Sequence, residues 1–199
     1  MPFRWRSGAI LILAGAMLTG PALAAEEDWP CVQRRVAELS VAQMWAGPPI
    51  DPAKTRWRDD PSVASLVRSL ASRRTSLDEA SSAIERFSNG AGTEKDTKLT
   101  MLFAGVFELI NAERRRIING IGRYARKQKA LANEINETSR ILKQNDRPAA
   151  ERTSLEQKLK WDTRIYDDRN HALTYVCESP VLLEQRVFAL AQEISRHLD

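Results

Sequence analysis

The longest uninterrupted helical pattern in the chain covers residues 94–144, which read EKDTKLTMLFAGVFELINAERRRIINGIGRYARKQKALANEINETSRILKQ. This stretch contains no proline, and its only glycines are Gly105, Gly120 and Gly122. Its apolar residues recur in alternating steps of three and four, the heptad spacing of a helix that packs against another helix. The stretch therefore predicts one helix of about 50 residues, about 75 Å long at the rise of an α-helix.

The same spacing continues over residues 149–198 and keeps its phase across Pro180. A proline inside a helix removes a hydrogen bond and bends the rod, so we expect a second long helix with a kink at this residue. The turn at 145–148 is short, which makes the two helices antiparallel neighbours. Their apolar seams match best when the numbers of facing residues add to about 293, which places Tyr124 opposite Arg169.

Two shorter helices are predicted before this hairpin, over residues 61–73 and 76–88. Asp60 precedes a proline, the arrangement of an N-cap followed by Pro at the first helical position. Ser76 and Glu79 form the pattern of a capping box. Residues 31–46 also have helical potential before the chain reaches Gly-Pro-Pro.

These short helices are expected to pack on the half of the hairpin made by residues 94–120 and 172–198. The other half, 121–171, is more charged and is expected to protrude as a two-stranded coiled-coil arm. The fold class is thus all-α: a long antiparallel helical hairpin with short N-terminal helices packed on its base, forming a single helical domain over 25–199. The packed half carries more apolar residues than a two-helix seam needs, namely Leu102, Leu109, Ile118, Leu182 and Phe188.

Residues 1–24, MPFRWRSGAILILAGAMLTGPALA, have the pattern of a secretory signal peptide. Arg4 and Arg6 precede an apolar run of about ten residues, and Ala22 and Ala24 supply the small residues of a cleavage site. The alternative is a membrane anchor, which would need about 20 apolar residues. We therefore expect cleavage after Ala24, a mature chain without a transmembrane segment, and a periplasmic or secreted location.

Cys31 and Cys177 are the only two cysteines in the chain. In an exported protein an even number of cysteines favours a disulfide bond. We expect these two to form one intramolecular bridge, although an intermolecular bridge or two free thiols would also satisfy the composition.

The formal net charge of +4 and the pI near 9.3 invite a nucleic-acid interpretation. Loss of the signal peptide would remove two arginines and no acid, which leaves the mature chain close to charge balance. A basic stretch remains around residues 114–129 and includes Arg123 and Arg126. It could bind phosphate or anionic lipid, or form the solvated outside of the coiled coil, balanced by Asp162, Asp167 and Asp168. Export favours the second interpretation, and we expect no nucleic-acid partner.

Polar residues in the predicted seam suggest how the hairpin is aligned. Asp162 and Arg169 lie one heptad apart, with Glu113 on the facing helix, and buried polar groups commonly fix the register of a coiled coil. Arg169 could also stack on Tyr124 as a cation–π pair. The alternative is a surface for a ligand or partner on the arm, made of Arg123, Arg126, Trp161, Tyr166 and Arg169.

Catalytic and metal-binding motifs are weak in this sequence. Asp167, Asp168 and His171 share one helical turn, which permits a metal site but is more typical of an ordinary helix surface. Trp29, Trp45 and Trp57 suit anchors for the irregular N-terminal part, or a sugar-stacking platform. No nucleophile elbow, phosphate loop or dinucleotide motif occurs, so we predict no catalytic residue, no metal site and no cofactor.

Four segments of the chain resemble one group of proteins. They are DWPCVQ (28–33), MWAGPP (44–49), WDTRIYDDR (161–169) and LTYVCE…VLLEQR (173–186). Here the chain is similar to uncharacterised exported helical proteins of Gram-negative, mainly alphaproteobacterial, type. The resemblance implies a periplasmic setting and brings no functional residue with it.

The sequence as a whole favours a non-enzymatic periplasmic scaffold, adaptor or chaperone-like protein that binds another envelope component through its arm. One alternative is a periplasmic protein that binds a small ligand or metal with the Trp-rich N-terminal part and the region of Asp167 and His171. An enzyme such as a cell-wall hydrolase is the third and least favoured class. The partner and the oligomeric state are not encoded in any motif of the chain.

Overall fold

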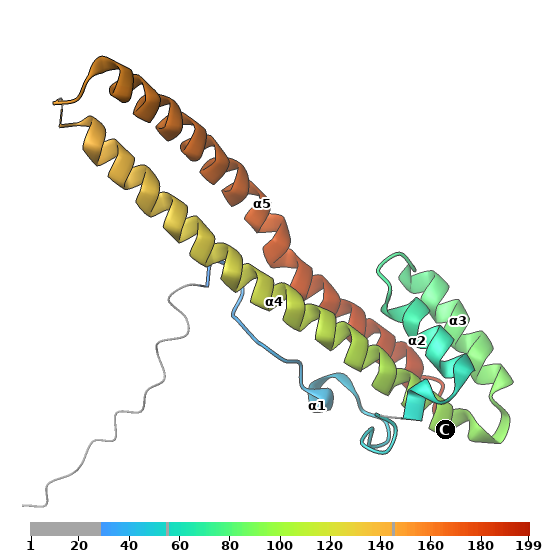
Figure 1. Cartoon of the computed structure of the whole chain (residues 1–199). Helices are drawn as coiled ribbons and strands as arrows, with labels where there is room; N and C mark the ends of the chain where they lie inside the picture. Colours follow the sequence, from blue (N-terminus) through green and yellow to red (C-terminus); the bar gives the residue numbers. More distant parts are fainter. Residues whose placement is uncertain (1–28, 55, 145) are drawn as a thin grey trace, which may run out of the picture.

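The computed structural model describes residues 29–54, 56–144 and 146–199. These residues form helices and connecting segments and contain no strand, which confirms the all-α class (Figure 1). The predicted signal peptide, 1–24, lies outside the described residues. The helices are α1 (Val41–Met44), α2 (Pro61–Ala71), α3 (Leu77–Gly90), α4 (Lys95–Leu142) and α5 (Ala149–Ser195), with 3₁₀ turns at Arg56–Arg58 and Gly92–Glu94.

Helices α4 and α5 form the predicted antiparallel hairpin (Figure 1). The Tyr124 hydroxyl donates a hydrogen bond to the carbonyl oxygen of Arg169 at 2.9 Å, so the expected facing pair is correct. At the open end of the hairpin, the Lys95 ammonium lies 2.5 Å from a carboxylate oxygen of Asp199. Helix α5 runs through Pro180 without interruption, as the unbroken phase of its heptads predicts.

The N-terminal segment differs from its prediction. Residues 31–46 were expected to have helical potential, but only Val41–Met44 is helical. The backbone N–H of Leu39 donates to the Asn111 side chain at 3.1 Å, and the carbonyl of Val36 accepts from Arg114 at 2.5 Å. These contacts with α4 take backbone groups that a helix would bond internally, which is why the segment stays extended along the hairpin.

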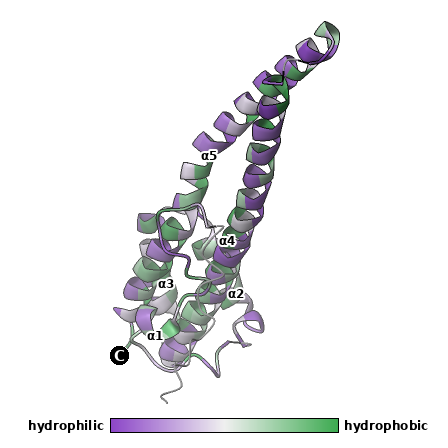
Figure 2. Cartoon of the chain, turned by 90° about the vertical axis from the view of Figure 1, so that its left-hand side faces the viewer, coloured by the Kyte–Doolittle hydropathy of each residue, from purple (hydrophilic) through white to green (hydrophobic). Residues whose placement is uncertain are grey.

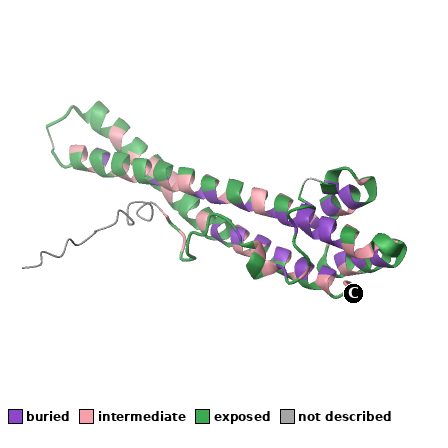
Figure 3. Cartoon of the chain, turned by 90° about the horizontal axis from the view of Figure 1, so that it is seen from below, coloured by how far each residue is buried: buried purple, intermediate pink, exposed green. Residues whose placement is uncertain are grey.

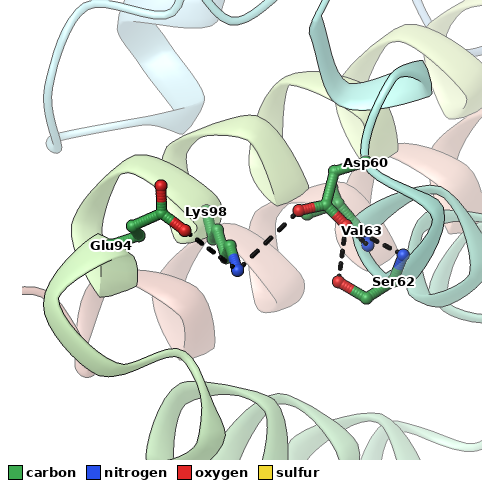
Figure 4. A network of polar contacts seen from close by, with 5 residues as sticks. All are labelled: Asp60, Ser62, Val63, Glu94 and Lys98. Atoms are coloured by element: carbon green, nitrogen blue, oxygen red, sulfur yellow. Dashed lines mark hydrogen bonds and ion pairs between the residues drawn. The ribbon is translucent and has the colours of Figure 1, made fainter.

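The start of α2 is held to the start of α4 by a polar network (Figure 4). The Asp60 carboxylate accepts hydrogen bonds from the backbone N–H groups of Ser62 at 2.8 Å and Val63 at 3.1 Å, so it is the predicted N-cap. The Ser62 hydroxyl also donates to this carboxylate and is the main cause of the lowered pKa of Asp60. The bonds from the two backbone N–H groups lower it further. Lys98 lies between two carboxylates, 3.2 Å from Glu94 and 3.9 Å from Asp60.

Helix α3 begins with the capping box that the sequence predicts. The Glu79 backbone N–H donates to the Ser76 hydroxyl at 3.2 Å, and the Ser76 backbone N–H donates to the Glu79 carboxylate at 2.8 Å. Both interactions satisfy N–H groups that have no partner within the helix. The Ser76 backbone N–H and the Ser76 hydroxyl both donate to the Glu79 carboxylate and lower the pKa of Glu79, with the backbone bond as the main cause.

The hydrophobic core occupies the base of the hairpin, where α2, α3 and the N-terminal segment pack on α4 and α5 (Figure 2). Buried residues gather there and become sparse along the rest of the hairpin (Figure 3). Beyond Ile121 on α4, the buried side chains are the polar Gln128 and Thr138. The half of the hairpin over residues 121–171, predicted to be more charged, therefore has little apolar core of its own.

Three details of the hairpin differ from expectation. Leu182 and Phe188 were expected to support the packed half, but they are 52% and 47% exposed. Phe188 lines an open cavity beside the N-terminal segment. Glu113 was placed in the seam, yet it is exposed and Arg114 is buried instead. Arg114 is inside because the N-terminal segment covers it.

Gly105 is required where α4 touches α2. A Cβ atom at this position would lie 2.6 Å from Cγ2 of Val67 and 2.8 Å from Cδ2 of Trp57. At Gly120 the nearest atom is the flexible end of Arg123, 3.9 Å away.

Gly105→Ala is therefore expected to lower the free energy of unfolding by about 1–3 kcal/mol, because the added methyl group overpacks the core. The control Gly120→Ala should instead raise it by about 0.5–1 kcal/mol through better helix propensity. Urea unfolding of both variants measures the two changes in the free energy of unfolding. Changes of the same sign would contradict this account.

Candidate functional site

Cys31 and Cys177 form the predicted intramolecular disulfide, with an S–S distance of 2.00 Å and a Cα–Cα distance of 5.6 Å. The bond joins the start of the described chain to the middle of the hairpin, across a sequence separation of 146 residues. The N-terminal segment is thereby held along one side of the base.

Helices α2 and α3 occupy another side of the hairpin base. The Arg186 guanidinium of α5 donates to the carbonyl oxygen of Leu70 at 2.8 and 2.9 Å, at the end of α2. The Ser81 hydroxyl of α3 donates to Glu193 of α5 at 2.8 Å. Toward the turn between α4 and α5, the hairpin extends well beyond α2 and α3. The side of the hairpin that these two helices cover at the base is therefore uncovered along the arm (Figure 1).

The uncovered side of α5 carries large apolar side chains. Trp161 is 64% exposed and Tyr175 is 75% exposed. About seven turns separate Trp161 from Arg186 and about three separate Tyr175 from Arg186, so all three lie on one face of α5. Trp161, Tyr175 and Leu182 are spaced by multiples of seven, the repeat that packs against another helix, and the exposed Asp168 occupies the heptad position between Trp161 and Tyr175. We call these three residues the arm stripe.

Arg123 and Arg126 of α4 face the same side. Arg123 lies about five turns from Gly105, whose backbone packs against α2, so the two positions share a face of α4. Both arginines are exposed, and within the described part of the chain neither has an ion pair or hydrogen bond. The arm stripe and these two arginines lie on one side of the hairpin, along the line between α4 and α5. We call this surface the arm groove; it includes three of the five surface residues predicted from sequence.

The other two predicted surface residues, Tyr166 and Arg169, serve the hairpin seam. Their backbone carbonyls accept hydrogen bonds from Gln128 at 3.2 Å and Tyr124 at 2.9 Å. The contact between Tyr124 and Arg169 is thus a hydrogen bond from the Tyr124 hydroxyl to the Arg169 backbone. The cation–π contacts of the described residues involve Trp29 and Trp57. Gln128 is the buried polar side chain at this level of the hairpin.

The expected charge balance between the two helices is wrong in detail. Asp162 pairs with Lys158 on its own helix, and Asp168 lies 4.0 Å from Arg164, also on α5. One pair that crosses the hairpin is Lys158 with Glu134, at 2.6 Å. The hydrogen bonds from Lys158 to Asp162 and then Glu134 raise the pKa of Lys158. Among the described contacts, Arg123 and Arg126 have no ion pair with Asp162, Asp167 or Asp168.

The predicted tryptophan anchors are present at two positions. Trp45 and Trp57 are buried, and the Trp57 indole N–H donates to Glu108 at 3.0 Å. They are consequently unavailable as a sugar platform. Over the residues that the structure describes, no cluster of three or more His, Cys, Asp or Glu side chains could hold a metal ion, and Asp167 and His171 are exposed.

Sequence reasoning missed Arg114, which is only 4% exposed. Its guanidinium donates to the Val36 carbonyl and, at 3.3 Å, to the Glu184 carboxylate, while its Nε atom is buried without a partner. Burial lowers the pKa of Arg114. A signal was available, because Ile110, Arg114 and Ile118 are spaced by four and fit a helix seam.

The chain matches no protein family model, no curated protein and no solved structure. Within the described ranges, none of the helices combines the length and apolar character needed to span a bilayer.

Proposed function

We propose that this protein is a non-enzymatic helical adaptor of the periplasm that binds an amphipathic helix of another envelope component in the arm groove. The observation that carries the proposal is the arm stripe, a row of exposed apolar side chains at heptad spacing. Such a row loses its contact with water when a further helix packs on it, which favours association.

The groove continues the surface on which the protein's own helices already pack. Helix α3 contacts α5 at Glu193, about five turns along the same face from Tyr175. A partner helix would extend this layer along the arm, with α5 on one flank and α4 on the other. The arm stripe spans about 30 Å, the length of about 20 helical residues.

The positive charge of the arm groove predicts acidic residues on one edge of the partner helix. Arg123 and Arg126 have no partner among the described residues and face the groove from α4. A helix with an apolar heptad face and acidic residues along the edge that meets α4 would complement them. The disulfide supports a periplasmic location, because such bonds persist in oxidising compartments.

Site-directed photo-crosslinking in the native envelope tests this proposal. A benzophenone amino acid at Trp161 or Tyr175 is expected to crosslink the same partner through one amphipathic helical segment. The matched control is Thr163, which is exposed but lies almost opposite Trp161 around the helix axis. Equal crosslinking from Thr163, or none from either stripe position, would refute the proposal.

A charge-reversal variant tests whether the partner helix has an acidic edge. Arg123→Glu combined with Arg126→Glu should weaken partner binding by up to about fivefold for each ion pair lost, the range of exposed pairs. An unchanged affinity would show that the partner does not carry an acidic edge at α4.

A further inference from the structure

A concave surface lies on the side of the base that the N-terminal segment covers. It is a cavity of about 610 Å³ between that segment and helices α4 and α5, close to the disulfide. This volume is within the range of small-molecule sites, about 300–1,000 Å³. Eight of its fourteen lining residues are apolar, including Trp29, Met44, Ile118, Pro180, Val181 and Phe188, and three of the polar ones are glutamines.

Arg114 is the polar group that distinguishes this cavity from a packing defect. It lines the cavity, and its side chain is almost fully buried while the Nε donor has no partner in the protein. A buried donor without an acceptor is costly, and a charged one more so. A ligand carboxylate at the cavity wall would add a charge-assisted contact to the terminal nitrogens of Arg114, which otherwise donate to the Val36 carbonyl and to Glu184 at 3.3 Å.

The charge of the lining selects an anion. Arg114 and Arg34 both line the cavity, and among the described residues that line it Glu184 is the one acid. The contact of Glu184 with Arg114 is long, at 3.3 Å, and 44% of the Glu184 side chain is exposed to solvent. Among the described lining residues, two guanidinium groups thus face a single carboxylate, which favours an anionic ligand.

We propose that this cavity binds a small amphiphile with one carboxylate and an apolar chain, its carboxylate held by Arg114 and its chain packed against Trp29, Ile118 and Phe188. The site is independent of the proposed adaptor function, because no residue of the arm groove lines it. Loss of one binding activity would therefore leave the other intact.

Titration of the mature protein with dodecanoate, below the concentration at which it forms micelles, tests the assignment. Calorimetry measures affinity, and a change in tryptophan fluorescence that is absent from Trp29→Phe places the ligand in the cavity. The neutral probe is dodecanol and the cationic probe is dodecyltrimethylammonium. Dodecanoate is expected to bind at least about tenfold more tightly than either, the value of a charge-assisted hydrogen bond. Equal affinity for the three probes, or no saturable binding of dodecanoate, would overturn the proposal.

Two substitutions sharpen the test. Glu184→Gln removes the carboxylate that competes for Arg114 and should tighten dodecanoate binding several-fold. The control Glu178→Gln makes the same charge change outside the cavity and should have no effect. Arg114→Met should abolish the preference for dodecanoate over dodecanol. If Arg114→Met does not fold, Glu184→Gln still decides, because unchanged or weaker binding in that variant contradicts the assignment.

Discussion

A chain with both Cys31→Ser and Cys177→Ser is expected to lose about 4–5 kcal/mol of unfolding free energy relative to the oxidised protein. The disulfide closes a loop of 146 residues, and the loss of unfolded-state entropy on cross-linking grows with loop length. Few described contacts other than this bond tie the N-terminal end to the middle of the hairpin. Urea unfolding of the double variant and of the oxidised parent gives the difference directly.

The reductant provides the control for this experiment. Dithiothreitol should lower the unfolding midpoint of the parent toward that of the double variant, and it should leave the variant unchanged. If the reduced parent remains as stable as the oxidised one, the bond contributes nothing to stability and the loop-entropy account fails. A further drop of the variant in reductant would show an effect unrelated to the disulfide.

Phe103→Ala is expected to lower the free energy of unfolding by about 3–5 kcal/mol. Phe103 is fully buried in the base, where its ring stacks on Trp45 with centroids 4.1 Å apart and lies 5.8 Å from the ring of Phe107. Its removal opens a cavity at the point where the N-terminal segment meets α4. Chemical denaturation measures the loss.

The matched control is Phe188→Ala, the same change on a side chain that is half-exposed. This variant should lose only about 1 kcal/mol, because about half of the side chain stays in water in the folded protein. Similar losses for the two variants would contradict the placement of the core. Phe188→Ala should also reduce dodecanoate affinity, whereas its effect on the arm groove should be nil.

The hairpin thus offers different surfaces on different sides. The arm groove continues the face covered by α2 and α3, and the cavity lies under the N-terminal segment. Each surface has its own guanidinium group: Arg123, without a partner among the described residues, on the arm, and Arg114, which contacts Val36 and Glu184, in the cavity. Variants can therefore separate the binding of a macromolecule from the binding of a small anion.

Local patterns in the sequence were sufficient for most of the fold. The heptad spacing predicted the lengths of α4 and α5 and the pairing of Tyr124 with Arg169. Asp60 and Ser76 predicted two helix starts, because capping depends on side chains within three residues of the cap. The two cysteines and the signal-like N-terminus together predicted the disulfide. Each of these inferences rests on chemistry that is local in the chain or on the small number of possible pairs.

Only the tertiary structure decided which sides of the hairpin are covered. The extended path of residues 31–40, the burial of Arg114 and the exposure of Leu182 all depend on segments far away in sequence. Helix periodicity arises from hydrogen bonds between residues four apart, so it depends only on residues that are close together in the sequence. The side on which a distant segment packs depends on the summed burial of many residues from separate parts of the chain. That is why the sequence determined the rod, its register and its disulfide, and the packed structure alone determined the arm groove and the cavity.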